Sequence, residues 1–165
     1  MKMKKKVAFL GVFLALALIF SYIETWIPNV FGVPGIKLGL ANIVIIILLF
    51  RFGTKEAYGI SVARVILAGF LFGNLASILY GLAGAMLSLT VMLLLKKTGK
   101  FKVITVSAVG GICHNVGQLI VAILVLENYR ISYYLPVLLI SGLVTGILIG
   151  IVAQEVILRL RMQYR

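Results

Sequence analysis

The chain contains no aspartate, and its four acidic residues are all glutamates. An aspartate-rich magnesium site for diphosphate chemistry is therefore excluded. There is one cysteine, Cys113, which excludes an internal disulfide and a cysteine-cluster metal site. No Walker motif is present, and no nucleophile stands beside an obvious base. We therefore predict no catalytic residue, no metal and no cofactor.

Charged residues make up 12% of the 165 residues, about half the share usual in soluble domains. Apolar residues make up 62%, and the mean hydropathy is +1.18. This composition predicts an all-α integral membrane bundle, forming one transmembrane domain over residues 1–165. The net charge of +12 would suit nucleic acid, but the basic residues follow a membrane topology. We predict contact with membrane lipid and no nucleic-acid partner.

Six apolar runs are expected to form about six transmembrane helices, at residues 7–23, 38–50, 57–72, 75–95, 103–126 and 135–158. The first follows a basic start, as a signal peptide would, but no small-residue cleavage site comes after it. We interpret it as a retained helix. The second and third runs are shorter than the ~17–25 residues of an ordinary span. They are expected to be tilted, broken or re-entrant.

Lysine and arginine predict the orientation, because cytoplasmic loops carry more of them than external loops. With the N-terminus inside, external loops hold only Lys37 and Arg130, and Arg64 lies within a run. The cytoplasmic segments hold thirteen basic residues: Lys2, Lys4, Lys5, Lys6, Arg51, Lys55, Lys96, Lys97, Lys100, Lys102, Arg159, Arg161 and Arg165. We predict a multi-pass membrane protein with both termini in the cytoplasm.

Three polar residues, His114, Asn115 and Gln118, interrupt the fifth run near its middle. Their spacing of three and four residues places them on roughly one helix face. Polar side chains within a bilayer are costly unless they find partners or face a water-filled cavity. The cluster therefore predicts a binding site.

Topology places further polar residues in the same outer half of the membrane. Arg64 lies eight residues after Glu56, or roughly 12 Å along an outward-running helix. We predict a cavity open to the outside, with Arg64 and His114 at its floor and the loop from Trp26 to Lys37 as its lid. The predicted substrate-binding set is Glu24, Lys37, Asn42, Arg64, His114, Asn115 and Gln118.

Each of these residues also has a structural interpretation. Arg64 can extend to the interface or bind helix carbonyls, and Asn42 can cap a helix or bond to a neighbouring one. Lys37 suits an interface anchor, and Glu24 suits the end of the first span. His114 can be a hydrogen-bonded core residue.

The chemistry of the set favours recognition over catalysis. An arginine binds carboxylate or phosphate oxygens with two parallel hydrogen bonds. The amides of Asn42, Asn115 and Gln118 offer donors and acceptors that suit an amide, a carbonyl or a heterocycle. A proton relay through lysine, glutamate and histidine remains an alternative.

Small residues recur at four-residue spacing in several runs, which lets helices approach closely. Gly11 and Ala15 do so in the first run, and Gly142, Gly146 and Gly150 do so in the sixth. Packing within the bundle is one interpretation. A contact with another membrane protein is the other, and it best suits Gly11 and Ala15.

Three motifs resemble those of one bacterial membrane family: KLGLAN at 37–42, SVAR at 61–64 and HNVGQ at 114–118, with Glu24 and Pro28 ahead of them. The family is called heptaprenyl diphosphate synthase component I, or Gx transporter. It is similar to the S-components of energy-coupling factor (ECF) transporters. This resemblance implies six helices and a small molecule, such as a vitamin, bound from outside. It also implies a transmembrane coupling subunit and ATPases, contacted here through Gly11 and Ala15.

The two family names lead to two hypotheses. The first is an S-component-like subunit for uptake of a vitamin or cofactor precursor. The alternative is a non-catalytic accessory subunit of prenyl diphosphate or quinone synthesis, because the chain has no aspartate to hold magnesium. A scaffold whose polar cluster only locks helices together is a third possibility. A flavin, a thiamine-like heterocycle and a polyprenyl precursor all suit the polar set.

Overall fold

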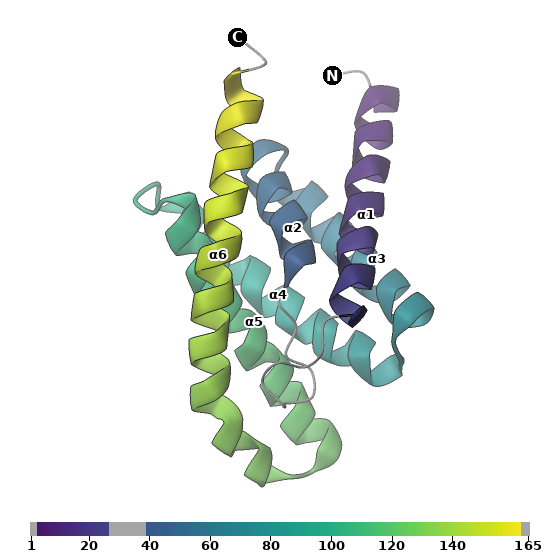
Figure 1. The fold of residues 1–165 in the computed structure, drawn as a ribbon, viewed down its shortest axis with the longest axis vertical. Helices are drawn as coiled ribbons and strands as arrows, with labels where there is room; N and C mark the ends of the chain where they lie inside the picture. Colours follow the sequence, from purple (N-terminus) through teal and green to yellow (C-terminus); the bar gives the residue numbers. More distant parts are fainter. Residues whose placement is uncertain (1–2, 27–38, 163–165) are drawn as a thin grey trace.

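The computed structural model describes residues 3–26 and 39–162, and these form helices joined by short connections (Figure 1). The elements in chain order are α1 (Met3–Trp26), α2 (Leu40–Arg51), α3 (Thr54–Phe72), α4 (Leu75–Lys97), α5 (Val103–Leu126), a 3₁₀ helix (Tyr129–Tyr134) and α6 (Leu135–Met162). No strand occurs in these two ranges. The predicted all-α class is confirmed, and each of the six apolar runs forms a helix.

Four segments are long and apolar enough to cross a membrane: Lys6–Trp26, Leu75–Lys97, Val103–Leu126 and Tyr129–Leu160. They establish a membrane-embedded helical protein. The helix of Leu40–Arg51 is apolar but shorter. Figure 1 places the start of α1 and the end of α6 at the same end of the bundle.

Local sequence explains several helix boundaries. Asn74 begins α4, and its side chain accepts a hydrogen bond from the Ser77 backbone N–H at 2.8 Å. Gly53 separates α2 from α3 with a φ of 137°, and Gly99 follows α4 with a φ of 68°. Residues other than glycine rarely adopt such φ angles, so both turns depend on glycine.

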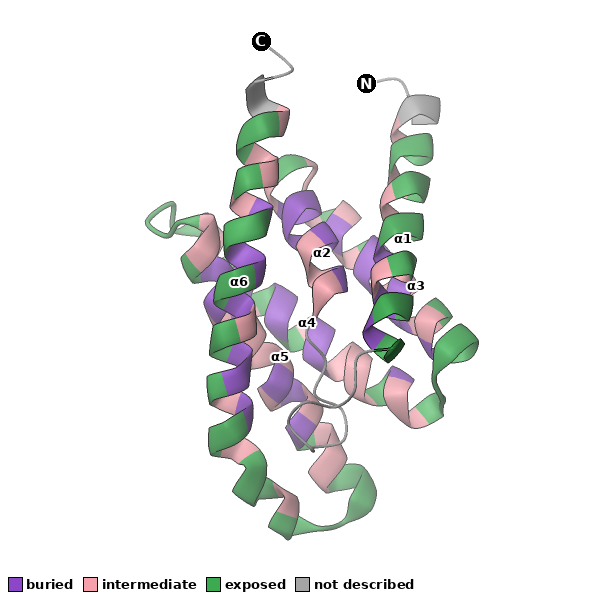
Figure 2. Cartoon of the chain, viewed as in Figure 1, coloured by how far each residue is buried: buried purple, intermediate pink, exposed green. Residues whose placement is uncertain are grey.

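The short helix α2 forms the centre of the core. Seven of its twelve residues are buried, and Leu48 and Leu49 are fully enclosed. Ala17 of α1, Leu89 of α4 and Val106 of α5 belong to the same apolar cluster. The buried colouring of α2 in Figure 2 contrasts with the exposed outer faces of α1 and α6, which are apolar and suit contact with lipid.

Helices α5 and α6 pack backbone to backbone along a line of glycines. A Cβ on Gly111 would lie 2.2 Å from the Gly142 carbonyl oxygen, and one on Gly146 would lie 2.7 Å from the Ser107 oxygen. The Ser107 hydroxyl also donates to the Gly146 carbonyl at 2.6 Å. The glycine stripe that the sequence shows in α6 is therefore an internal packing surface.

Candidate functional site

A cavity of about 90 Å³ lies between α1, α3, α4 and α5. Its lining comes from the last turns of α1, the second half of α3, the first half of α4 and the middle of α5. This places it towards the end of the bundle opposite the start of α1. Its polar side chains are Ser21, Glu24, Thr25, Arg64, Ser77, Tyr80, His114 and Gln118.

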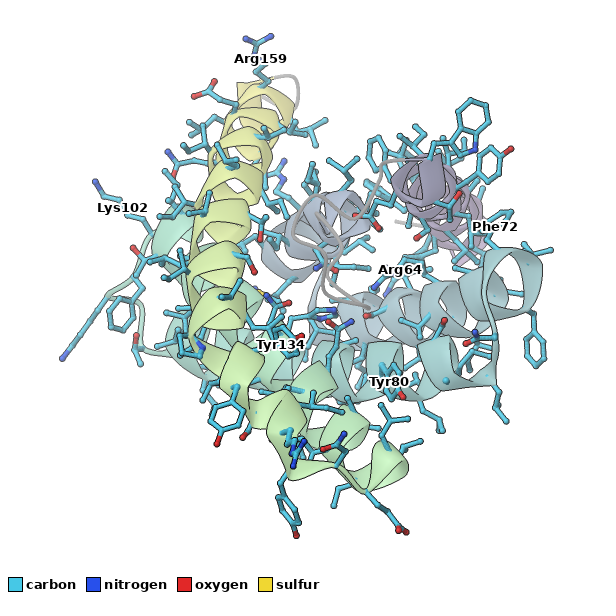
Figure 3. The ribbon with its side chains drawn as sticks, turned by 60° about the horizontal axis from the view of Figure 1, so that its bottom comes forward. Arg64, Phe72, Tyr80, Lys102, Tyr134 and Arg159 are labelled. Atoms are coloured by element: carbon cyan, nitrogen blue, oxygen red, sulfur yellow. The ribbon has the colours of Figure 1, made fainter. Side chains whose placement is uncertain are left out.

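Arg64 is the cation of the cavity. Its side chain points from α3 towards the middle of the bundle, whereas Lys102 and Arg159 project away from it (Figure 3). Arg64 is 9% exposed, and its Nη2 donates to Asn42 Oδ1 over a long 3.5 Å. Its Nε is buried and has no hydrogen-bond partner among the described residues.

Ser21 of α1 carries the other buried side-chain atom without a partner in the described part of the chain. Ser21 lines the same cavity as Arg64. Buried polar atoms are nearly always hydrogen-bonded, because an unpaired one costs free energy. Two such atoms therefore belong to residues that line one cavity.

Glu24 is the anion of the cavity and is 8% exposed. Its Oε1 accepts a hydrogen bond from the backbone N–H of Leu40, the first residue of α2. Gly39, at the cap position, provides no side chain for this purpose. Glu24 therefore caps α2 from a neighbouring helix, where a carboxylate also meets the positive end of the helix dipole. It attracts the Arg64 guanidinium electrostatically as well.

His114 and Gln118 reach the cavity from α5 across a glycine of α4. A Cβ on Gly84 would lie 3.0 Å from both His114 Cε1 and Gln118 Cγ, and 2.8 Å from the His114 carbonyl oxygen. Gly84 is thus required for these two side chains to lie where they do. Both line the cavity together with Arg64 and Glu24, so four residues of the predicted set lie around one space.

Asn115 has a different environment, although it lies between these residues in the sequence. It is 5% exposed, and its Nδ2 donates to the Leu138 carbonyl at 2.8 Å and to Ser141 Oγ at 3.2 Å. These bonds join α5 to α6, and Asn115 is not part of the cavity lining.

The remaining predicted residues are distributed as follows. Asn42 touches Arg64 but lines a second, smaller cavity of about 20 Å³. Lys37 lies outside the described residues, as does the predicted lid beyond Trp26. Gly11 and Ala15 are exposed on α1, and a Cβ on Gly11 would meet nothing within 4 Å.

Sequence reasoning missed four polar lining residues: Ser21, Thr25, Ser77 and Tyr80. Serines and tyrosines are common in membrane helices, so their identity alone gave no signal. Helical spacing did offer a signal for Ser21, because it lies three residues before Glu24 and hence on the same face of α1. Tyr80 lies four residues before Gly84, the glycine of α4 that contacts His114 and Gln118 of α5.

Among the described residues, no group of three or more histidine, cysteine, aspartate or glutamate side chains lies close enough to hold a metal ion. The polar lining consists of one guanidinium, one carboxylate, one imidazole, one amide and several hydroxyls. Such a set can bind an ion or a polar group by charge and hydrogen bonds.

Comparison with known proteins gives a match to a family model. No curated protein and no solved structure matches the chain. The family model of heptaprenyl diphosphate synthase component I matches residues 13–156, which include every cavity-lining residue. The chain therefore belongs to the heptaprenyl diphosphate synthase component I family.

Proposed function

We propose that the chain is a membrane-embedded binding subunit that captures a small molecule from the outer side of a bacterial cytoplasmic membrane. In this it would act as the S-components of ECF transporters do. The observation that supports the proposal is the cavity between α1, α3, α4 and α5. It is lined by a buried guanidinium whose Nε, like Ser21 Oγ, has no hydrogen-bond partner among the described residues.

The polar atoms favour a binding role over a purely structural one. A polar cluster that only locks helices together satisfies its own hydrogen bonds, as Asn115 does between α5 and α6. Arg64 Nε and Ser21 Oγ have no such bonds in the described chain. A ligand that accepts hydrogen bonds from these two groups removes the free-energy cost of leaving them unpaired.

The cavity is smaller than the ~300–1,000 Å³ of pockets that enclose a whole drug-sized ligand. We propose that it receives one polar group of the ligand. The rest of the molecule would extend towards Thr25 and Phe72, which line the cavity near the ends of α1 and α3.

The proposed orientation agrees with the contacts that basic residues make. Lys6 pairs with Glu56, Arg51 donates to the Leu160 carbonyl at 3.3 Å, and Lys96 donates to the Leu49 carbonyl. These contacts join the start of α1 to the start of α3, and the end of α2 to the ends of α4 and α6. We assign this basic end to the cytoplasm, so that the cavity opens outward.

Six spans are part of the proposal, with α2 and α3 added to the four long apolar segments. Transport driven by ATP would then require partner subunits, because the chain has no Walker motif. The exposed face of α1 around Gly11 and Ala15 would contact a transmembrane coupling subunit, since small residues allow close helix approach.

The family description supports a second candidate function equally well. A non-catalytic accessory subunit of prenyl diphosphate or quinone synthesis would use the same cavity for a product or precursor. The absence of aspartate leaves the metal-dependent step to another protein. A deletion strain separates the two functions, because loss of prenyl product with unchanged vitamin uptake favours the accessory role.

The binding function is tested by purifying the full chain in mild detergent and identifying co-purifying compounds by mass spectrometry. Arg64→Gln is expected to lose the bound compound. The matched control is Arg130→Gln, which changes an exposed arginine outside the cavity and should retain it. Folding of each variant is checked by thermal unfolding. A folded Arg64→Gln protein with full ligand content would refute the assigned site.

A further inference from the structure

The charges in the cavity limit what it can bind. Among the described lining residues, Arg64 contributes one positive charge and Glu24 one negative charge. With a neutral His114, the described lining has no net charge. Arg64 can pair with one negative charge of a guest, so a guest with several would leave the others unpaired beside Glu24 in a buried, low-dielectric space, which is strongly unfavourable.

The unused hydrogen-bonding capacity is that of a donor. Within residues 3–26 and 39–162, Arg64 Nε–H has no partner, and the neighbouring Nη2 donates to Asn42 over a long distance. These two nitrogens form one edge of the guanidinium, where a carboxylate docks with two parallel N–H···O bonds. Ser21, which lines the same cavity, carries a further hydroxyl donor with no partner in the described part of the chain.

Within the proposed binding function, we infer that the group entering this cavity is a single carboxylate held by the Arg64 guanidinium, and that Glu24 excludes diphosphates. A carboxylate is planar, carries one charge and is small enough for about 90 Å³. A diphosphate brings two or three negative charges into contact with Glu24. The site therefore selects a carboxylate-bearing small molecule and rejects the free diphosphate of a prenyl donor.

Glu24 can be tested without loss of its structural role. In Glu24→Gln the amide oxygen still accepts the Leu40 N–H bond that caps α2, while the negative charge disappears. Removal of a like charge near a bound anion is expected to strengthen anion binding by about fivefold or more. A residue with only a capping role would not change anion affinity in this way.

The experiment uses the full chain in lipid nanodiscs and three probes: acetate, acetamide and inorganic diphosphate. Acetamide has the shape of acetate without its charge. Binding is read from thermal unfolding and from the fluorescence of Trp26, the sole tryptophan, two residues after Glu24. Chloride at equal ionic strength is the reference. Acetate is expected to raise the unfolding temperature, and this effect should saturate at millimolar concentrations because the ligand is so small. Acetamide and diphosphate are not expected to raise the unfolding temperature.

Variants connect the response to the named atoms. Arg64→Gln and Arg64→Lys should both lose the acetate response, because lysine keeps the charge but not the two-nitrogen edge. Glu24→Gln should bind acetate more tightly and respond to diphosphate. Lys37→Gln measures any contribution from that cation, and Arg130→Gln should behave as the unsubstituted chain.

The outcomes separate this inference from the proposed function. A response to diphosphate or acetamide equal to that to acetate would overturn the carboxylate assignment. A co-purified ligand that contains no carboxylate but is lost in Arg64→Gln would also overturn the carboxylate assignment. In that case the proposed binding function would still hold. If no probe binds and no compound co-purifies with the folded chain, both the binding function and the inference fail.

Discussion

The contact between α5 and α6 at Gly111 can be tested by adding one methyl group. In Gly111→Ala the new Cβ would lie 2.2 Å from the Gly142 carbonyl oxygen and 3.1 Å from the Gly146 Cα. Both neighbours are backbone atoms, so no side chain can turn aside. The helices must separate by about 1 Å to restore ordinary contact distances.

The cost follows from what this separation disturbs. Overpacking of a close helix contact costs about 1–3 kcal/mol. Two interhelical hydrogen bonds near it, from Ser107 to Gly146 and from Asn115 to Leu138, are worth about 0.6 kcal/mol each in membrane proteins. Alanine recovers about 1 kcal/mol of helix propensity. The net destabilisation is about 1–3 kcal/mol, or roughly 2–12 °C in unfolding temperature for a chain of this size.

The assay is thermal unfolding in detergent followed by far-ultraviolet circular dichroism. Gly59→Ala is the matched control, because it has the same propensity gain and a Cβ there meets nothing within 4 Å. It is expected to unfold at or slightly above the original temperature. If Gly111→Ala unfolds within 1 °C of the original chain while Gly59→Ala is also unchanged, the backbone contact between α5 and α6 is refuted.

Three further outcomes are expected. Glu24→Ala should lower stability by about 1–2 kcal/mol through loss of the α2 cap, whereas Glu24→Gln should cost little, and equal melting temperatures would contradict the cap. Asn115→Leu should lower stability but leave acetate binding intact. Gln118→Leu should leave stability intact but weaken acetate binding, as read by unfolding and probe titration. The hydrogen bond from Lys6 lowers the pKa of Glu56, in the first turn of α3 ahead of the 57–72 run. This ion pair stabilises the fold above the ordinary glutamate pKa of about 4.5, and the contribution disappears as pH falls through the lowered value. Acid titration of unfolding should therefore show a smaller pH dependence in Glu56→Gln.

The helices were predictable because apolar runs of sufficient length have few alternatives in a membrane. The predicted runs at 75–95 and 103–126 agree closely with α4 and α5, since charged residues and glycine mark their ends. The predicted run at 57–72 begins three residues after α3 does. Its first turn, with Lys55 and Glu56, is polar and lies beyond the apolar signal.

The site was predictable only in part, because sequence spacing shows which residues share a helix face but not which helix that face meets. The same cavity is lined by Arg64, His114 and Gln118, as the direction of their helices through the membrane predicted. Asn115 points to α6 instead, since its partner there is the Leu138 carbonyl, a backbone atom that no sequence pattern marks. Ser21 was missed because its importance depends on its lack of a partner, which only the structure reveals.

The short helix α2 shows why length alone misjudges this bundle. Twelve residues extend about 18 Å, well short of a hydrocarbon core of about 30 Å. Its ends are satisfied by side chains of other helices, with Glu24 of α1 bonded to its first N–H and Lys96 of α4 bonded to the Leu49 carbonyl near its end. Such contacts let a short helix pack deep in the bundle, because they satisfy part of its end groups without water or lipid head groups, although Arg51 at its end is exposed. The anion that caps α2 also sets the charge of the cavity, so Glu24 links the stability of the core to the selection of the ligand.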